Sequence, residues 1–245
     1  MTSDDPVQLT FLGTRGSGEA CNKRHRRHSA LLLEGPEGRL MIDCGGDWLS
    51  ELPRLNPDAL FLTHAHPDHS AGLEQGSPCP VYATADTWQQ LPDYPLAERR
   101  WLTKGQKLIV AGLQVEPVPL YHSLRAPAVG YRIGTAGHNL FYAPDVAALV
   151  DPAEDLQGVD LYIGDGSALD RTLLRREQGY PCGHAPVQEQ LRWCHNARIG
   201  HMLISHCGEK IIADEAAALR ILTELAEPLN IKLSIACDSQ RLDFG

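Results

Sequence analysis

The sequence lacks several features that would place it in other protein classes. No apolar run exceeds about five residues, far below the roughly 20 that a membrane-spanning helix needs. No internal repeat or low-complexity stretch occurs, and Phe, Trp and Tyr make up only 6% of the 245 residues, so no base-stacking platform is expected. A basic excess is also absent, since 31 acidic residues face 22 basic ones. The net charge of −9 excludes a broad basic face for duplex DNA.

Paired cysteines are absent as well. The seven Cys are dispersed singly, and no Cys-x-x-Cys pair occurs. An odd, dispersed set is typical of reduced thiols in a cytoplasmic protein and unlike a disulfide framework. The first six residues are acidic and contain no apolar core, so we expect no signal peptide. We therefore expect a single cytoplasmic domain over residues 1–245.

Short apolar segments alternate with turn signals and amphipathic segments along the whole chain. This alternation is typical of an α/β layered sandwich. Helices are expected over 85–91, 186–196 and 214–226. Strands are expected over 7–12, 30–34, 39–43, 59–63, 81–83, 107–110, 113–120, 128–133, 139–142, 160–163, 202–205 and 232–236.

One short segment concentrates metal-ligand chemistry. Residues 62–69 read Leu-Thr-His-Ala-His-Pro-Asp-His and follow an apolar strand directly. The end of a strand can point alternate residues the same way, so His64 and His66 can share one ion. Asp68 and His69 fall on the next turn and can face a second ion. Imidazole and carboxylate suit Zn²⁺, and also Mn²⁺ or Fe, whereas a chance surface cluster is improbable at this density.

The pattern His-x-His-x-Asp-His is also the signature of the metallo-β-lactamase superfamily, which this chain resembles along nearly its whole length. Members begin with a strand and Gly turn like residues 9–14 and continue to a strand that ends in Asp-Cys-Gly, as at residues 43–45. The resemblance implies a four-layer αββα sandwich. It also implies that Asp43 orients a metal ligand from behind.

The resemblance further implies a complete ligand set for two divalent ions, with Zn²⁺ expected and Mn²⁺ as the alternative. Two ions ~3.5–4 Å apart can share a water, lower its pKa and clamp a phosphate. The implied ligands are His64, His66 and His122 for one ion, Asp68, His69 and His206 for the other, and Asp145 between them.

Two further segments resemble the ribonuclease Z branch of the superfamily. Residues 122–133 are similar to its third metal His and the Gly-Tyr strand that follows, and residues 183–186 are similar to the segment with its additional His. The resemblance implies that His184 acts as a general acid toward the leaving oxygen or stabilises the transition state electrostatically. The alternative is a residue near a helix start with no catalytic task.

The phosphonate-pathway cyclic phosphodiesterase shares the same layout, and the chain departs from both relatives. Only 22 residues separate His122 from Asp145, which leaves no room for the arm with which ribonuclease Z grips transfer RNA. Only Cys21 stands where the phosphodiesterase carries a Cys cluster for a structural zinc. Processing of transfer RNA and that extra zinc are therefore not expected.

A run of six basic or His residues, from Lys23 to His28, forms a local positive patch in an acidic protein. One interpretation is a phosphate-steering rim in which Arg26 and Arg27, together with Arg125, contact the substrate. A solvated charge run or a partner-binding loop is the alternative. The sequence does not decide between them.

Together these residues and the resemblance predict a binuclear metal-dependent hydrolase. We expect a phosphodiesterase acting on cyclic nucleotides or short nucleic-acid phosphodiesters through a hydroxide held between the metals, with Asp68 and His184 as catalytic residues. An acyl hydrolase of the lactonase or thioesterase type is the alternative, because the same ligands serve both. A non-catalytic binding protein is a further alternative, against which the complete ligand set argues. No membrane partner is expected. Homodimers are common in the superfamily, so a homodimer stays open.

Overall fold

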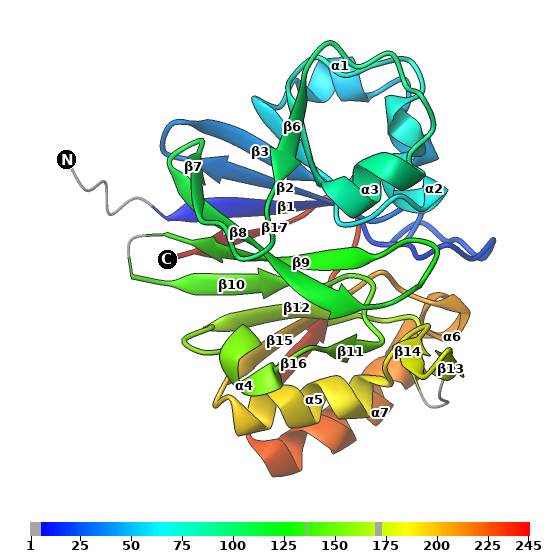
Figure 1. Ribbon diagram of the computed structural model, residues 1–245. Helices are drawn as coiled ribbons and strands as arrows, with labels where there is room; N and C mark the ends of the chain where they lie inside the picture. Colours follow the sequence, from blue (N-terminus) through cyan, green and yellow to red (C-terminus); the bar gives the residue numbers. More distant parts are fainter. Residues whose placement is uncertain (1–5, 136, 170–172) are drawn as a thin grey trace.

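Two sheets pack face to face in the computed structural model, which describes residues 6–135, 137–169 and 173–245 (Figure 1). The first sheet is mixed and runs in the order β17-β1-β2-β3-β4-β5-β6. Its strands are β1 (Val7–Gly13), β2 (Ala30–Gly35), β3 (Gly38–Ile42), β4 (Ala59–Phe61), β5 (Val81–Thr84), β6 (Arg99–Leu102) and β17 (Gln240–Phe244).

The second sheet is also mixed and runs in the order β11-β8-β9-β10-β12-β15-β16, with β7 paired to β8. Its strands are β7 (Leu108–Val110), β8 (Leu113–Tyr121), β9 (Ala128–Gly134), β10 (Asn139–Tyr142), β11 (Ala148–Leu149), β12 (Leu161–Asp165), β15 (His201–Ser205) and β16 (Lys232–Ile235). A separate hairpin pairs β13 (Arg175–Glu177) with β14 (Tyr180–Cys182).

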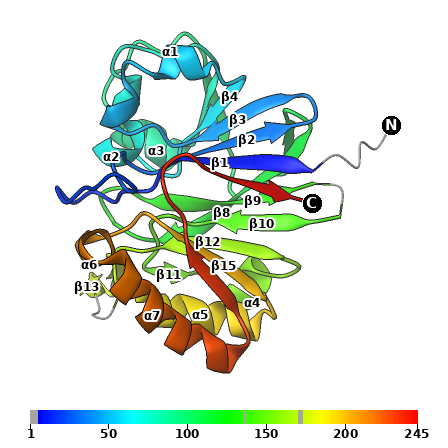
Figure 2. The same ribbon diagram turned by 180° about the vertical axis from the view of Figure 1, so that it is seen from behind.

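Helices cover the outer face of each sheet, so the predicted αββα layering is confirmed (Figure 2). Next to the first sheet lie η1 (Gly46–Trp48), α1 (Leu52–Leu55), α2 (Pro67–Ser70), η2 (Ala71–Leu73) and α3 (Ala85–Gln90). Against the second sheet lie α4 (Pro152–Asp155), α5 (Val187–Asn196), α6 (Glu209–Ala213), α7 (Glu215–Ala226) and η3 (Glu227–Leu229).

Three apolar clusters hold these layers together. The middle one lies between the sheets and joins residues such as Leu9 and Leu33 of the first sheet to Tyr131 and Ile163 of the second. The other two lie between each sheet and its helices. Burial of apolar surface on both sides explains why so many strands are apolar throughout, without the alternation of a half-exposed strand.

Two predicted strands end earlier than expected, and the reason bears on the site. The strand expected over 39–43 stops at Ile42 because Asp43 has a φ of 64°, outside the extended region. The strand expected over 59–63 stops at Phe61, and Thr63 N donates to the Asp43 carboxylate at 2.8 Å. The two strand ends are therefore joined by one buried carboxylate directly before the His-rich segment.

The sequence did not predict every element. Three of the unexpected strands, β6, β13 and β17, are rich in polar residues, so they carry no apolar run to detect. The hairpin strand β14 and the two-residue β11 are too short to give a pattern, as are α1, α2, α4 and α6. The seven Cys are all free thiols. Among the described residues, no helix is both long enough and apolar enough to cross a membrane.

Candidate metal centre

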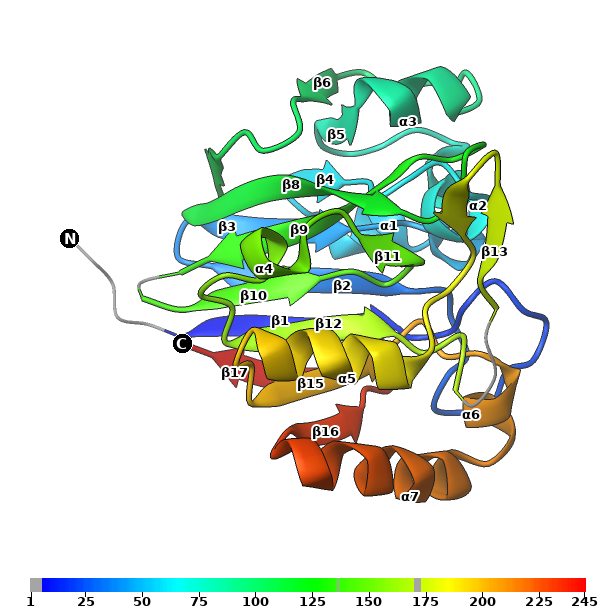
Figure 3. The same ribbon diagram turned by 60° about the horizontal axis from the view of Figure 1, so that its bottom comes forward.

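The His-rich segment lies at the end of β4, where strands of both sheets terminate on the same side of the molecule (Figure 3). Pro67 begins α2, with His66 in extended conformation before it. The Ser70 hydroxyl donates to the carbonyl oxygens of Ala65 and His66, each at 3.1 Å. These bonds fix the turn, so that the side chains of the segment are held on the side facing the second sheet.

The first group of converging ligand atoms contains three imidazoles and one carboxylate. His64 Nε2 lies 2.9 Å from His66 Nδ1 and 3.4 Å from Asp145 Oδ2. His122, at the end of β8, places Nε2 at 3.3 Å from His66 Nδ1 and 3.9 Å from the same Asp145 oxygen. The predicted group His64, His66, His122 and Asp145 is thus brought together from both sheets.

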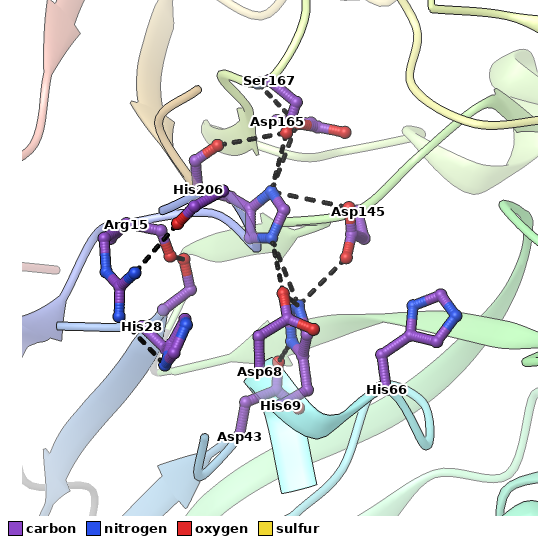
Figure 4. A network of polar contacts seen from close by, with 12 residues as sticks. Arg15, His28, Asp43, His66, Asp68, His69, Asp145, Asp165, Ser167 and His206 are labelled. Atoms are coloured by element: carbon purple, nitrogen blue, oxygen red, sulfur yellow. Dashed lines mark hydrogen bonds and ion pairs between the residues drawn. The ribbon is translucent and has the colours of Figure 1, made fainter. Parts of the chain in front are cut away.

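The second group shares Asp145 with the first. His69 Nε2 lies 3.0 Å from Asp145 Oδ2, 3.4 Å from Asp68 Oδ2 and 3.3 Å from His206 Nε2. His206 Nε2 is also 3.3 Å from Asp68 Oδ2. The predicted group Asp68, His69, Asp145 and His206 is therefore assembled as well (Figure 4).

These separations fit divalent ions. A tetrahedral ion with ligands at 2.0–2.1 Å places its ligand atoms about 3.3 Å apart, and most separations in the two groups lie near that value. Asp145 Oδ1 is buried and forms an ion pair with His184 Nδ1 at 3.0 Å, so a cation of the protein already compensates part of its charge. The donor set and its spacing are therefore consistent with divalent metal binding at both groups.

Hydrogen bonds behind the imidazoles set their tautomers. The Nδ1 atoms of four of them face an acceptor: Asp43 at 2.8 Å for His69, Thr63 Oγ1 at 3.0 Å for His64, the Gly183 carbonyl at 3.1 Å for His122, and Ser167 Oγ at 2.9 Å for His206. With Nδ1 protonated, each Nε2 lone pair points into the centre. Such supports orient metal ligands and raise their basicity. Asp43 contacts His69 from behind, and an orienting role for it stays a prediction.

The pKa values divide the centre into two electrostatic halves. Burial lowers the pKa of His64 well below its ordinary value, helped by repulsion from His69 and His122, and burial is also the largest cause of the lowered pKa of His66. At His69 burial acts in the same direction, but the Asp43 and Asp68 carboxylates outweigh it and raise the pKa well above its ordinary value. The carboxylates therefore dominate the electrostatics of the second group, and a divalent ion bound there would displace a proton from His69.

His184 lies directly beside the centre. Its Nδ1 is 2.7 Å from Asp165 Oδ2 and 3.0 Å from Asp145 Oδ1. Burial opposes its charged form, but Asp165 and Asp145 outweigh burial and raise the pKa of His184 to about 11. The imidazole is therefore held as a cation next to the Asp145 carboxylate that the two groups share.

Asp165 and Gln190 anchor this imidazole; the sequence left Asp165 open between a cleft residue and a turn residue, and Gln190 was not predicted. Fully buried Asp165 accepts hydrogen bonds from Val146 N and Ser167 N besides His184. Buried Gln190, on α5, accepts from Asp165 N at 2.9 Å and donates to the carbonyl oxygens of Asp165 and Ala185. Asp165 follows an apolar strand as the predicted ligands do, although an Asp beside Gly is more often a turn residue. No sequence signal distinguishes Gln190.

The predicted substrate contacts lie in three different places. His184 lines a cavity of about 410 Å³ together with residues that include Gly16, Gly18, Ser167 and Gly208. Arg125 is exposed in the loop between β8 and β9. Arg26 and Arg27 line a separate depression. A role for these three arginines in substrate binding stays a prediction.

The fold and the site together define the class of protein. Residues 38–207 match the family model described as a beta-lactamase superfamily domain, so this chain belongs to that superfamily. Ribonuclease Z of Methanopyrus kandleri is 30% identical over 149 residues, which are 54% of this chain and 52% of that protein. The chain thus spans about half the length of this relative.

Solved structures agree on the fold over almost the whole chain. The metallo-β-lactamase fold protein YhfI from Bacillus subtilis superposes with a TM-score of 0.74, 19% sequence identity and coverage of 98% of this chain and 100% of that one. A diphosphatase from the PhnP family gives a TM-score of 0.72 at 18% identity, with 98% of each chain covered. At these identities the likeness concerns the fold alone.

Proposed function

We propose that this protein is a binuclear metal-dependent hydrolase that cleaves phosphodiesters, with cyclic nucleotides and short nucleic-acid phosphodiesters as its substrates. The observation that carries the proposal is the pair of ligand groups that share Asp145. Seven side chains would hold two divalent ions, for which we propose Zn²⁺: His64, His66, Asp68, His69, His122, Asp145 and His206. Two bound ions supply Lewis acidity and an activated water at neutral pH.

His184 supports phosphate rather than carbonyl chemistry. Because Nδ1 is engaged by Asp165 at 2.7 Å, Nε2 is the nitrogen that can reach a substrate in the cavity that His184 lines. A cationic imidazole there donates a hydrogen bond to a phosphate oxygen and can protonate the departing alkoxide. Asp165, which is not a proposed ligand, raises the pKa of His184 and so favours a proton donor at this position.

Asp68 is the carboxylate proposed to act on the nucleophile. Its Oδ2 atom lies between His69 and His206, at 3.4 and 3.3 Å from their Nε2 atoms. Attraction to His69 and hydrogen bonds from His206 and His69 overcome the effect of burial and lower its pKa far below the ordinary value. Asp68 therefore remains a carboxylate at neutral pH and can accept a hydrogen bond from an attacking water.

The name of one relative supports a phosphate substrate, since it is a ribonuclease. The ligand groups themselves serve acyl transfer equally well. The test is hydrolysis of bis-p-nitrophenyl phosphate, a lactone and a thioester by the metal-loaded protein, with the Asp68→Ala variant as control. We expect phosphodiester turnover that Asp68→Ala abolishes. Turnover of the lactone or thioester alone would overturn the phosphodiesterase proposal in favour of an acyl hydrolase.

A further inference from the structure

A basic depression lies apart from the metal centre, with a volume of about 430 Å³. In Figure 2 the blue loop between β1 and β2, α1 and the red connection before β17 lie toward the same end of the first sheet. These segments supply its ionisable lining residues: Lys23, Arg26, Arg27, Glu51, Arg54 and Asp238. We call this depression the basic pocket.

The acidic residues of the basic pocket are already engaged. Asp238 Oδ1 accepts from the backbone and hydroxyl of Thr14, and its Oδ2 accepts from the backbone N–H groups of Arg26 and Arg27 at 2.9 and 3.0 Å. Glu51 pairs with Arg54 at 3.3 Å. The side chains of Lys23 and Arg26 make no ion pair with a described residue, so cationic groups are left for an external anion.

The floor of the basic pocket favours a phosphate over a base. Trp48 is only 2% exposed, and the Arg27 guanidinium lies 4.5 Å from the centre of its ring. The indole face is therefore covered and cannot stack on a nucleobase. The guanidinium is positioned by this contact, and Arg is a side chain that can bind phosphate bidentately.

The loop that carries these cations is fixed in place. Asn22 accepts from the N–H groups of Arg24 and His25 and donates to the Ile212 carbonyl. The Arg24 guanidinium pairs with Glu215 on α7 at 2.6 Å, and buried His25 lies 3.1 Å from the same carboxylate. A loop held from both sides loses little entropy when it binds a ligand. A mere solvated charge run would not need these anchors.

A short series of contacts links the basic pocket to the segment that carries the metal ligands. Trp48 Nε1 donates to the His28 carbonyl at 3.1 Å, and the His28 ring pairs with Asp47 at 2.7 Å. A Cβ added at Gly45 would touch both the His28 side chain and the Asp68 backbone, so Gly45 is packed closely against both residues. These contacts connect the floor of the basic pocket, through His28, to the segment that carries Asp68.

We propose that the basic pocket binds a phosphate group of a nucleic-acid strand or a nucleotide, outside the bond that the metal centre cleaves. Only the link to cleavage rests on the proposed function. The pocket gives the chain a site for a second phosphate of its substrate. It also accounts for a cationic cluster in a protein of net charge −9.

The test is binding of a labelled phosphorothioate thymidine dodecamer, which resists hydrolysis, followed by fluorescence anisotropy. In the variant Lys23→Ala/Arg26→Ala we expect about tenfold weaker binding at low salt and a salt-dependence slope smaller by about 1 to 1.5. The backbone bonds of Arg26 to Asp238 remain in this variant. The matched control is Arg220→Ala, an exposed cation on α7, which should bind as the unmodified protein does.

Equal binding by the double variant and the unmodified protein would overturn the proposal. Competition by adenosine monophosphate distinguishes the source of the phosphate: displacement at comparable concentrations indicates a nucleotide site, and displacement only by the oligonucleotide indicates a strand site. Hydrolysis of bis-p-nitrophenyl phosphate by the unmodified protein and by Arg220→Ala tests the proposed function separately from the binding. If none of the proteins tested hydrolyses this compound, the proposed function is contradicted, whereas the binding result still stands.

Discussion

The two sheets contribute to the metal centre in different ways. The first sheet supplies four ligand residues from one segment, His64 to His69, directly after β4. The second sheet supplies His122, Asp145 and His206 singly, from three places about 20 to 60 residues apart. One centre can therefore take about half of its ligand residues from a single short segment and the others from segments distant in the sequence. Its two halves should therefore respond differently to substitution.

The largest effect is expected at Asp145, where the two halves meet. Asp145→Ala removes the carboxylate common to both ligand groups. We expect loss of most bound metal and a fall in phosphodiester turnover of at least about a thousandfold. Metal content by plasma mass spectrometry and turnover of bis-p-nitrophenyl phosphate measure both. Retention of both metals by this variant would contradict the shared role.

A catalytic loss without metal loss is expected at His184. His184→Ala removes the cation beside Asp145 but no proposed ligand. We expect kcat to fall by about 10²–10⁴, the usual contribution of a general acid, with metal content unchanged. Steady-state kinetics and metal analysis on one preparation separate the two effects. Loss of metal in parallel with activity would make His184 a ligand instead.

A smaller loss of metal affinity is expected from the residue behind the first sheet's ligands. Asp43→Asn keeps the size of the side chain but weakens the 2.8 Å contact with His69 Nδ1. We expect metal affinity to fall by about 10–100-fold. Titration of the metal-free protein with a competing chelator measures it, and Asp93→Asn, an exposed carboxylate outside both ligand groups, is the control. An unchanged affinity would show that Asp43 serves the fold alone.

The smallest effect is expected at Gln190, which acts on His184 through the backbone. Gln190→Ala leaves Asp165 N and two buried carbonyl oxygens without their partner. We expect the free energy of unfolding to fall by about 1–3 kcal/mol. We also expect kcat to fall more than KM rises, because His184 loses its fixed position. Denaturant unfolding and the kcat and KM values measure the two outcomes. A loss of stability with unchanged kcat would leave Gln190 a structural role only.

The division between ligands from one segment and ligands from distant segments explains which part of the centre the sequence could predict. The His-rich segment was recognisable because four ligand-type residues stand within six positions, a local pattern that no helix or strand requires. His122, Asp145 and His206 each look ordinary in their own segments, and only the family resemblance connected them. Their convergence depends on sheet order, which joins strands distant in sequence such as β10, β12 and β15.

Asp165 and Gln190 show where such prediction ends. Asp165 stands between two glycines, where a turn role is the ordinary expectation, yet it is fully buried and holds His184. Gln190 lies on α5, and its role depends on the approach of that helix to β12. The polar strands β6 and β17 escaped prediction for a related reason, because backbone pairing defines them and apolar patterning does not.

The metal centre and the basic pocket can be compared in the same way. Carboxylates and imidazoles line the first, and mainly cationic side chains line the second. The loop from Thr14 to His28 connects the two, since Thr14 accepts from Cys207 N beside the His206 ligand and donates to Asp238 of the pocket. Substitutions that affect one site and leave the other unchanged would show that the two sites act independently.

The most direct test of the central claim is a crystal structure with anomalous diffraction data collected on both sides of the zinc absorption edge. We expect two anomalous peaks about 3.5–4 Å apart, one among His64, His66 and His122 and one among Asp68, His69 and His206, with Asp145 touching both. A single peak, or none in protein that hydrolyses its substrate, would contradict the binuclear zinc centre.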